Sequence, residues 1–257
     1  MMQLLERKQL KDMAHKQLEG HWGNMALRTF LISVITMGAA SIPYSGFMVS
    51  VVMSGTSGRM TPAGGTIAVI CYLLMLAVII LAMPMQYGFI HGCMKLRSGE
   101  PSQVGIIFSK YNMLPKILML LVYEIIFVLA SMIIFVPALL LMDKLPPLGF
   151  VLMLAWYVAI FYIAIRVSMC TYILVENPYT SVWTSIKQSW NLMKGHIWRY
   201  LVLDLSFLGW ILLAMLTCGI LMYWVTPYMT MTFLNFYYDL KGNTLAQAEE
   251  AAVEFVN

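Results

Sequence analysis

Three charged side chains, Glu124, Arg166 and Asp204, stand inside long apolar segments of this 257-residue chain. A charge at the centre of a bilayer costs about 2.5–3.5 kcal/mol on insertion scales, so each one is a candidate functional group. We expect Glu124 about nine residues into one membrane span and Arg166 about nine residues from the inner end of the next, both roughly 14 Å deep. The two charges could then meet across a hairpin, with Asp204 as a competing carboxylate.

This candidate intramembrane polar site has three interpretations. An arginine beside one or two carboxylates can be a structural ion pair that fixes helix register, because pairing offsets most of the cost of burial. The same groups can bind an anionic or proton-coupled substrate, or they can face a water-filled groove. The residue types alone leave all three open.

Motifs of established enzyme classes are missing from the sequence, among them HExxH, G-x-S-x-G and the P-loop. The four cysteines occur singly, without a CxxC pair, and the four histidines are isolated. Neither a zinc site nor another cofactor is therefore expected. The sequence predicts a protein that is not an enzyme.

The composition indicates a membrane protein, with 61% hydrophobic and only 11% charged residues. Residues 29–58, 60–94 and 205–238 contain no Asp, Glu, Lys or Arg, and about 18 such residues already suggest a span. We predict an all-α, polytopic transmembrane helical bundle of about six spans, forming a single membrane domain over 1–257. The spans are expected near 25–53, 66–94, 115–142, 148–175, 197–217 and 220–238, with a turn at 217–219.

Amphipathic helices are expected to lie in the interface on the cytoplasmic side. One covers 1–20 and another 178–195, where Asn177 can be the N-cap and Pro178 the first helical residue; a shorter one covers 101–110. A cytoplasmic tail follows at 241–257. Basic residues on the two longer helices are candidate contacts for anionic lipids: Lys8, Lys11, Lys16, Lys187 and Lys194.

Lysine and arginine also predict the topology, because cytoplasmic loops carry an excess of them. If the N-terminus is cytoplasmic, the outer loops hold Arg59 and Lys144. The inner side then holds thirteen basic residues: Arg7, Lys8, Lys11, Lys16, Arg28, Lys95, Arg97, Lys110, Lys116, Lys187, Lys194, Arg199 and Lys241. We expect a multi-pass protein of the cell (cytoplasmic) membrane with both termini in the cytoplasm.

Several short elements carry a resemblance to a known family. They are LKDMAHKQLEGHWGNMA at 10–26, ILVENP at 173–178, MKGH at 193–196, LDLSFLGW at 203–210 and WVTPY at 224–228. With these elements the chain resembles the bacterial membrane proteins of domain-of-unknown-function family 975. The resemblance implies a multi-span bacterial inner-membrane protein, distantly similar to the membrane domain of some glycerophosphodiester phosphodiesterases. It implies no catalytic residues, because the family is uncharacterised.

Two functions are favoured by these observations, ahead of an intramembrane enzyme, because Glu124 and Asp204 lack a recognisable partner nucleophile or metal set. The first is a non-enzymatic membrane scaffold, accessory or regulatory component, which has the bilayer, anionic lipids and an unidentified membrane protein as partners, and no nucleic acid. The alternative is a small transporter or lipid-handling permease that uses the intramembrane Arg/carboxylate site.

Overall fold

The computed structural model of the chain describes residues 4–57, 62–100 and 103–256, with side chains at 53–57, 62–64, 143–144 and 243–256 left out. The described part contains helices and no strand, which confirms the all-α prediction. Arg59 of the predicted outer side and the start of the predicted 101–110 helix lie outside the described residues. The elements are α1 (Arg7–Leu18), α2 (Trp22–Ser57), α3 (Pro62–Arg97), the 3-10 turns η1 (Val104–Phe108) and η2 (Tyr111–Met113), α4 (Leu114–Lys144), α5 (Pro146–Val167), α6 (Cys170–Glu176), α7 (Val182–Leu192), α8 (Ile197–Leu205), α9 (Leu208–Leu216) and α10 (Met222–Val256).

Five helical segments of the described chain are long and apolar enough to cross a membrane, so this is a multi-pass membrane protein. They are Trp22–Val52, Gly65–Arg97, Val104–Met142, Pro146–Glu176 and Ile197–Leu216. The sixth expected span, 220–238, is helical but forms the first part of α10 and is not among the five. Its polar side chains Thr232 and Asn235 are buried inside the protein, as in a core helix.

Two of the expected spans are interrupted. The segment expected at 148–175 breaks at Ser168 and Met169, between α5 and α6, and the one at 197–217 breaks at Ser206 and Phe207, between α8 and α9. Each break leaves backbone carbonyls without their helical partners. The turn predicted at 217–219 is confirmed, since Cys218 and Gly219 have φ of 53° and 84°.

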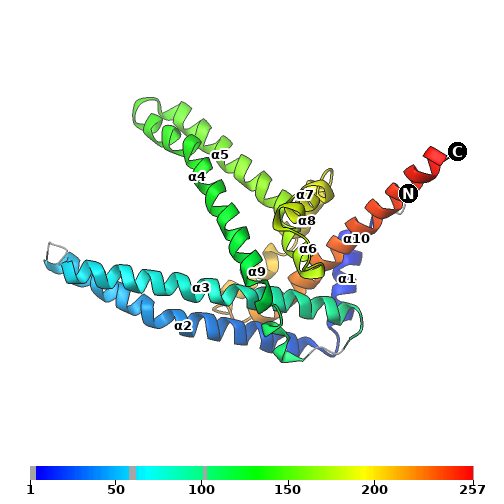
Figure 1. The fold of residues 1–257 in the computed structure, drawn as a ribbon, viewed down its shortest axis with the longest axis horizontal. Helices are drawn as coiled ribbons and strands as arrows, with labels where there is room; N and C mark the ends of the chain where they lie inside the picture. The colour runs from blue at the N-terminus through cyan, green and yellow to red at the C-terminus, as the bar shows by residue number, and fades with distance from the viewer. Residues whose placement is uncertain (1–3, 58–61, 101–102, 257) are drawn as a thin grey trace.

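The long helices form two hairpins that diverge from a common base (Figure 1). The base is the part of the molecule that holds α1, α6, α7, α8 and the first half of α10. Helices α2 and α3 pair along one hairpin, and α4 and α5 pair along the other. Both ends of the chain lie on the side away from the hairpin tips, where the last part of α10 projects from the base (Figure 1). The packed core and the hairpin tips are therefore at opposite ends of the molecule.

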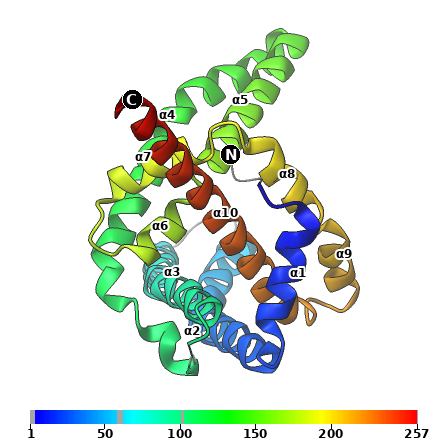
Figure 2. The ribbon, with the colours of Figure 1, turned by 90° about the vertical axis from the view of Figure 1, so that its right-hand side faces the viewer.

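Helix α10 is the centre of this base. In Figure 2 it runs between α1 on one side and α6 and α7 on the other. The apolar face of α1, formed by Leu10, Ala14 and Leu18, is buried, and α1 packs against α10. This face of the predicted N-terminal surface helix is covered by protein instead of lipid.

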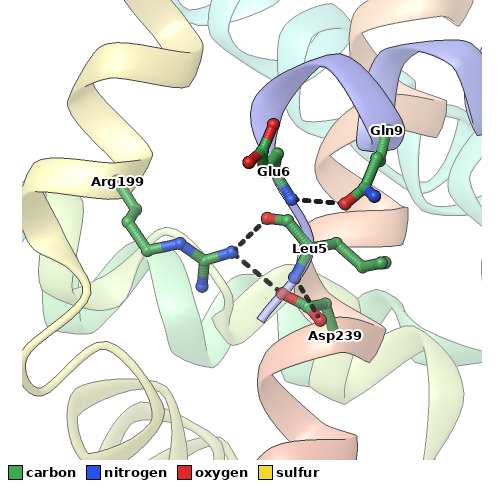
Figure 3. Close-up of polar contacts among 5 residues, drawn as sticks. All are labelled: Leu5, Glu6, Gln9, Arg199 and Asp239. Carbon is green, nitrogen blue, oxygen red and sulfur yellow. Dashed lines mark hydrogen bonds and ion pairs between the residues drawn. The ribbon is translucent and has the colours of Figure 1, made fainter. Parts of the chain in front are cut away.

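A polar bridge joins the start of the chain to α8 and α10 (Figure 3). The Arg199 guanidinium donates to the Leu5 carbonyl at 2.7 Å and to the Asp239 carboxylate at 3.0 Å. The backbone N–H of Leu5 donates to the same carboxylate at 3.2 Å. Because the Asp239 side chain is only 5% exposed, this bridge supplies partners that water would otherwise provide.

Helix α3 approaches η1 closely at Gly88. A Cβ atom at this position would lie 2.2 Å from the Ile107 carbonyl oxygen. We expect Gly88→Ala to lower the free energy of unfolding by about 1–3 kcal/mol, the usual cost of overpacking, measured by thermal unfolding in detergent. The matched control is Gly38→Ala in α2, where a Cβ meets nothing within 4 Å. Equal stability of both variants would contradict the close α3–η1 packing.

Candidate functional site

Helix α7 crosses the base of the α4–α5 hairpin and contacts both helices. Its N-cap is Ser181, whose hydroxyl accepts a hydrogen bond from the Thr184 backbone N–H at 3.2 Å. The prediction of a cap at Asn177 with Pro178 as the first helical residue was therefore wrong. The reason is that residues 177–181 form the turn that follows α6, and the helix starts only after it.

Arg166 joins the end of α5 to the end of α7. Its guanidinium donates to the Trp190 carbonyl at 2.7 Å and to the Tyr162 hydroxyl at 2.8 Å. The Ser189 hydroxyl donates in return to the Arg166 carbonyl at 2.8 Å. Both carbonyls lie in the last turn of a helix, where orphan acceptors and the helix dipole favour a donor or a cation.

The Arg166 side chain is also enclosed by aromatic rings. Its guanidinium carbon lies 4.8 Å from the Trp190 ring centroid and 5.3 Å from that of Tyr162, and the residue is 9% exposed. No ion pair joins Arg166 to Glu124 or Asp204 in the described part of the chain. The expected meeting of these charges is therefore not found, because the arginine reaches backbone and aromatic partners nearer to it.

A pocket of about 630 Å³ lies beside this joint, between α4, α5, α6 and α7. This volume is within the range of about 300–1,000 Å³ typical of ligand pockets. We call it the α7 pocket; its lining is Leu120, Tyr123, Glu124, Phe127, Ile160, Ile163, Ala164, Val167, Ser168, Cys170, Thr171, Trp183, Ile186, Lys187 and Trp190. Most of these side chains are apolar or aromatic, which is the surface that an acyl chain or another apolar group requires.

Glu124 is an exposed member of this lining. Its carboxylate forms no hydrogen bond or ion pair with any residue that the structure describes. Asp204 is also exposed, but it lies on α8, outside the pocket. Of the three predicted charges, the structure thus places one in the pocket, one in the joint beside it and one elsewhere.

The five candidate lipid-contact lysines divide into three groups. Lys187 lines the α7 pocket, with its Nζ 5.3 Å from the Trp183 ring centroid. Lys11 is engaged inside the protein, where Nζ donates to the Ser206 carbonyl at 3.0 Å and lies 4.1 Å from the Phe207 ring centroid. Burial, and to a lesser extent the charge of Arg7, lowers the pKa of Lys11.

The remaining three lysines of that set, Lys8, Lys16 and Lys194, are exposed. They remain available to a membrane surface.

A second cavity, of about 620 Å³, lies between the α6–α7 turn and α10 and is lined in part by Glu176 and Lys241. Here the carboxylate is engaged by the chain itself. Lys241 donates to both of its oxygens at 2.7 Å, and the Tyr237 hydroxyl donates at 2.5 Å. The two charged residues of this lining, Glu176 and Lys241, are therefore already paired with each other.

Two residues of the α5–α7 joint, Ser189 and Tyr162, were not among the predicted site residues. The 3-4-3 spacing of Trp183, Ile186 and Trp190 predicts the face of α7 that meets the pocket. This spacing does not predict the hydrogen bonds to backbone carbonyls. Every residue has a carbonyl, and the sequence does not show which carbonyls lack a helical partner.

The α5–α7 joint can be tested with Arg166→Met. We expect the free energy of unfolding to fall by about 1.5–3 kcal/mol, because hydrogen bonds from a charged donor are lost and the Trp190 carbonyl is left without its partner. Thermal unfolding in detergent measures this. The double variant with Glu124→Gln should be no more stable than Arg166→Met, since Glu124 does not contact the guanidinium. Recovery in the double variant would instead indicate a direct Arg166–Glu124 pair.

Comparison with known proteins identifies a family without a known activity. No curated protein and no solved structure matches the chain. A match to the family described as "Protein of unknown function (DUF975)" covers residues 1–244. This range includes the α7 pocket, the α5–α7 joint and the polar bridge at the start of the chain. The chain therefore belongs to the DUF975 family of proteins of unknown function.

Proposed function

We propose that this protein is a non-enzymatic accessory or regulatory component of the membrane that holds a lipid in the α7 pocket. The observation that carries the proposal is the pocket itself, an apolar cavity at the level of the membrane spans with a charged residue on each of two walls. An apolar lining with a few polar groups is typical of a binding site. Retaining a lipid requires no catalytic group and no cofactor.

A lipid-handling permease is the second candidate, and the exposed Glu124 favours it. A carboxylate facing an apolar pocket can take part in moving a charged headgroup or a proton across the membrane. Against it stands Arg166, the residue best suited to bind an anionic cargo, because its guanidinium is committed to Tyr162 and Trp190. The geometry therefore supports lipid retention above transport.

We also infer a bacterial cytoplasmic membrane as the location, with both termini in the cytoplasm. Of the exposed lysines, Lys8 and Lys16 belong to α1, and Lys194 lies in the turn that follows α7. These segments lie at the base, and both ends of the chain lie on the same side, away from the hairpin tips (Figure 1). Basic residues gathered at one end of a multi-span protein favour the cytoplasmic side for that end. A membrane protein partner would meet the chain through this base or through its lipid-facing helices.

Lipid retention can be tested by filling the pocket with Ala164→Trp. Ala164 is exposed on the α5 wall of the pocket, so an indole there would occupy the space of an acyl chain. We expect lipid binding to weaken by about tenfold, equivalent to about 1.4 kcal/mol. Mass spectrometry of lipids that remain bound after detergent exchange measures this.

The matched control for Ala164→Trp is Ala159→Trp, an exposed α5 position outside the lining. Equal lipid content in the two variants would contradict lipid retention by the pocket. Vesicles containing the wild-type protein and a fluorescent phospholipid distinguish the second candidate. Lipid exchange between leaflets no faster than in protein-free vesicles is expected, and acceleration that Glu124→Gln abolishes would favour a permease.

The base should also attract anionic lipid through its exposed lysines. We expect Lys8→Gln, Lys16→Gln and Lys194→Gln, combined in one variant, to reduce the enrichment of phosphatidylglycerol around the protein. The expected size is about 1 kcal/mol per lysine near an anionic surface. Lipid contacts of a spin-labelled phosphatidylglycerol in vesicles measure it. Lys11→Gln is the control, because Lys11 already donates to the Ser206 carbonyl, and an equal loss in the control would contradict the assignment.

A further inference from the structure

The charges of the α7 pocket have opposite signs and come from two different helices. Glu124 belongs to α4 and Lys187 to α7, and both side chains are exposed. No ion pair joins them in the described part of the chain. The pocket therefore presents one anion and one cation within an otherwise mainly apolar surface.

Aromatic contacts join the two helices that carry these charges. The Tyr123 ring, next to Glu124 in sequence, lies with its centroid 6.0 Å from that of Trp183. Trp183 precedes Lys187 by four residues, so the two share one face of α7, and the Lys187 Nζ lies 5.3 Å from the Trp183 ring centroid. Glu124 and Lys187 thus line one pocket from two helices that meet at the Tyr123–Trp183 contact.

This pair of charges discriminates between classes of amphiphile. A purely anionic lipid would gain from Lys187 but would meet the Glu124 carboxylate in a region where charge repulsion is poorly screened. A purely cationic amphiphile would meet the converse problem at Lys187. A headgroup that carries both charges satisfies both side chains, and the apolar lining receives its acyl chain.

We propose that the α7 pocket selects a phospholipid whose headgroup bears a primary ammonium beside its phosphate, with the phosphate at Lys187 and the ammonium at Glu124. This inference rests on the proposed function of lipid retention. A primary ammonium donates hydrogen bonds to a carboxylate, which are stronger than neutral ones. A quaternary ammonium has no N–H and cannot donate such a hydrogen bond to the Glu124 carboxylate.

The test is a lipid competition on the purified, delipidated full-length protein in detergent. Equal amounts of phosphatidylethanolamine, phosphatidylcholine and phosphatidylglycerol are supplied, and mass spectrometry measures the lipid that is retained. The wild-type protein is expected to retain phosphatidylethanolamine in preference to the other two. Glu124→Gln and Lys187→Gln are each expected to reduce that preference about tenfold, the effect of about 1.4 kcal/mol. Asp204→Asn, which changes an exposed carboxylate outside the pocket, should leave it unchanged.

Each outcome of the competition is decisive. Preference of the wild type for phosphatidylglycerol or phosphatidylcholine, or an unchanged preference in both charge variants, would overturn the headgroup assignment. The proposed function is judged separately by Ala164→Trp, which should reduce retention of all three lipids. If Ala164→Trp acts and the charge variants do not, only the headgroup inference fails. Because both charged side chains are exposed, both variants should fold. If Glu124→Gln on α4 fails to insert into the membrane, Lys187→Gln on α7 still tests the headgroup preference.

Discussion

The structure depends on how it satisfies the backbone carbonyls of its interrupted helices. Each helix end inside a membrane protein leaves carbonyls that have no intrahelical partner and little access to water. Here long basic side chains reach these carbonyls from other elements. Apart from Arg166, they are residues expected on the cytoplasmic side, which thus also join the helices. The pairs are Arg166 with Trp190, Lys110 with Val175, Lys116 with Pro178 and Thr180, and Lys11 with Ser206. Arg199 binds the Leu5 carbonyl in the same way, just before α1 begins.

The α7 pocket follows from this constraint. The Arg166 guanidinium donates to the Trp190 carbonyl and the Ser189 hydroxyl donates to the Arg166 carbonyl, and these two bonds hold α7 against the end of α5. With α7 held there, its indole rings face the α4–α5 hairpin and close one side of the cavity. The Arg166 guanidinium is already hydrogen-bonded within the chain. Glu124, on α4, remains an exposed charge in the pocket lining. A structural role for one intramembrane charge and a binding role for the other are therefore compatible.

Sequence predicts the elements of this protein better than it predicts their contacts. Long uncharged stretches indicate the spans, and Thr217, Cys218 and Gly219 mark a turn that the structure contains. The spacing of Trp183, Ile186 and Trp190 also predicts which face of α7 meets the pocket. The breaks after Val167 and Leu205 were not predicted because both segments are long and mostly apolar, and neither break carries a Gly or Pro. The Glu124–Arg166 pair was predicted from the similar depth of the two residues, but depth does not determine the direction of a side chain. The residue types also do not show which backbone carbonyls will accept a hydrogen bond. The sequence predicted a span at 220–238 followed by a tail at 241–257, whereas α10 is one helix from Met222 to Val256. Its first half differs from the five spans in being buried by protein, which hydropathy does not reveal.

The far end of the α4–α5 hairpin has a consequence for recognition. Helix α4 ends at Lys144 and α5 begins at Pro146, so Leu145 alone connects them. At Gly149 a Cβ would lie 2.8 Å from the Met142 backbone nitrogen, which shows how closely the two helices meet. An antibody or a protease needs several residues of projecting, adaptable chain, and this tip provides none. An epitope tag inserted there would separate the two helices, so the base is the better place to attach a label.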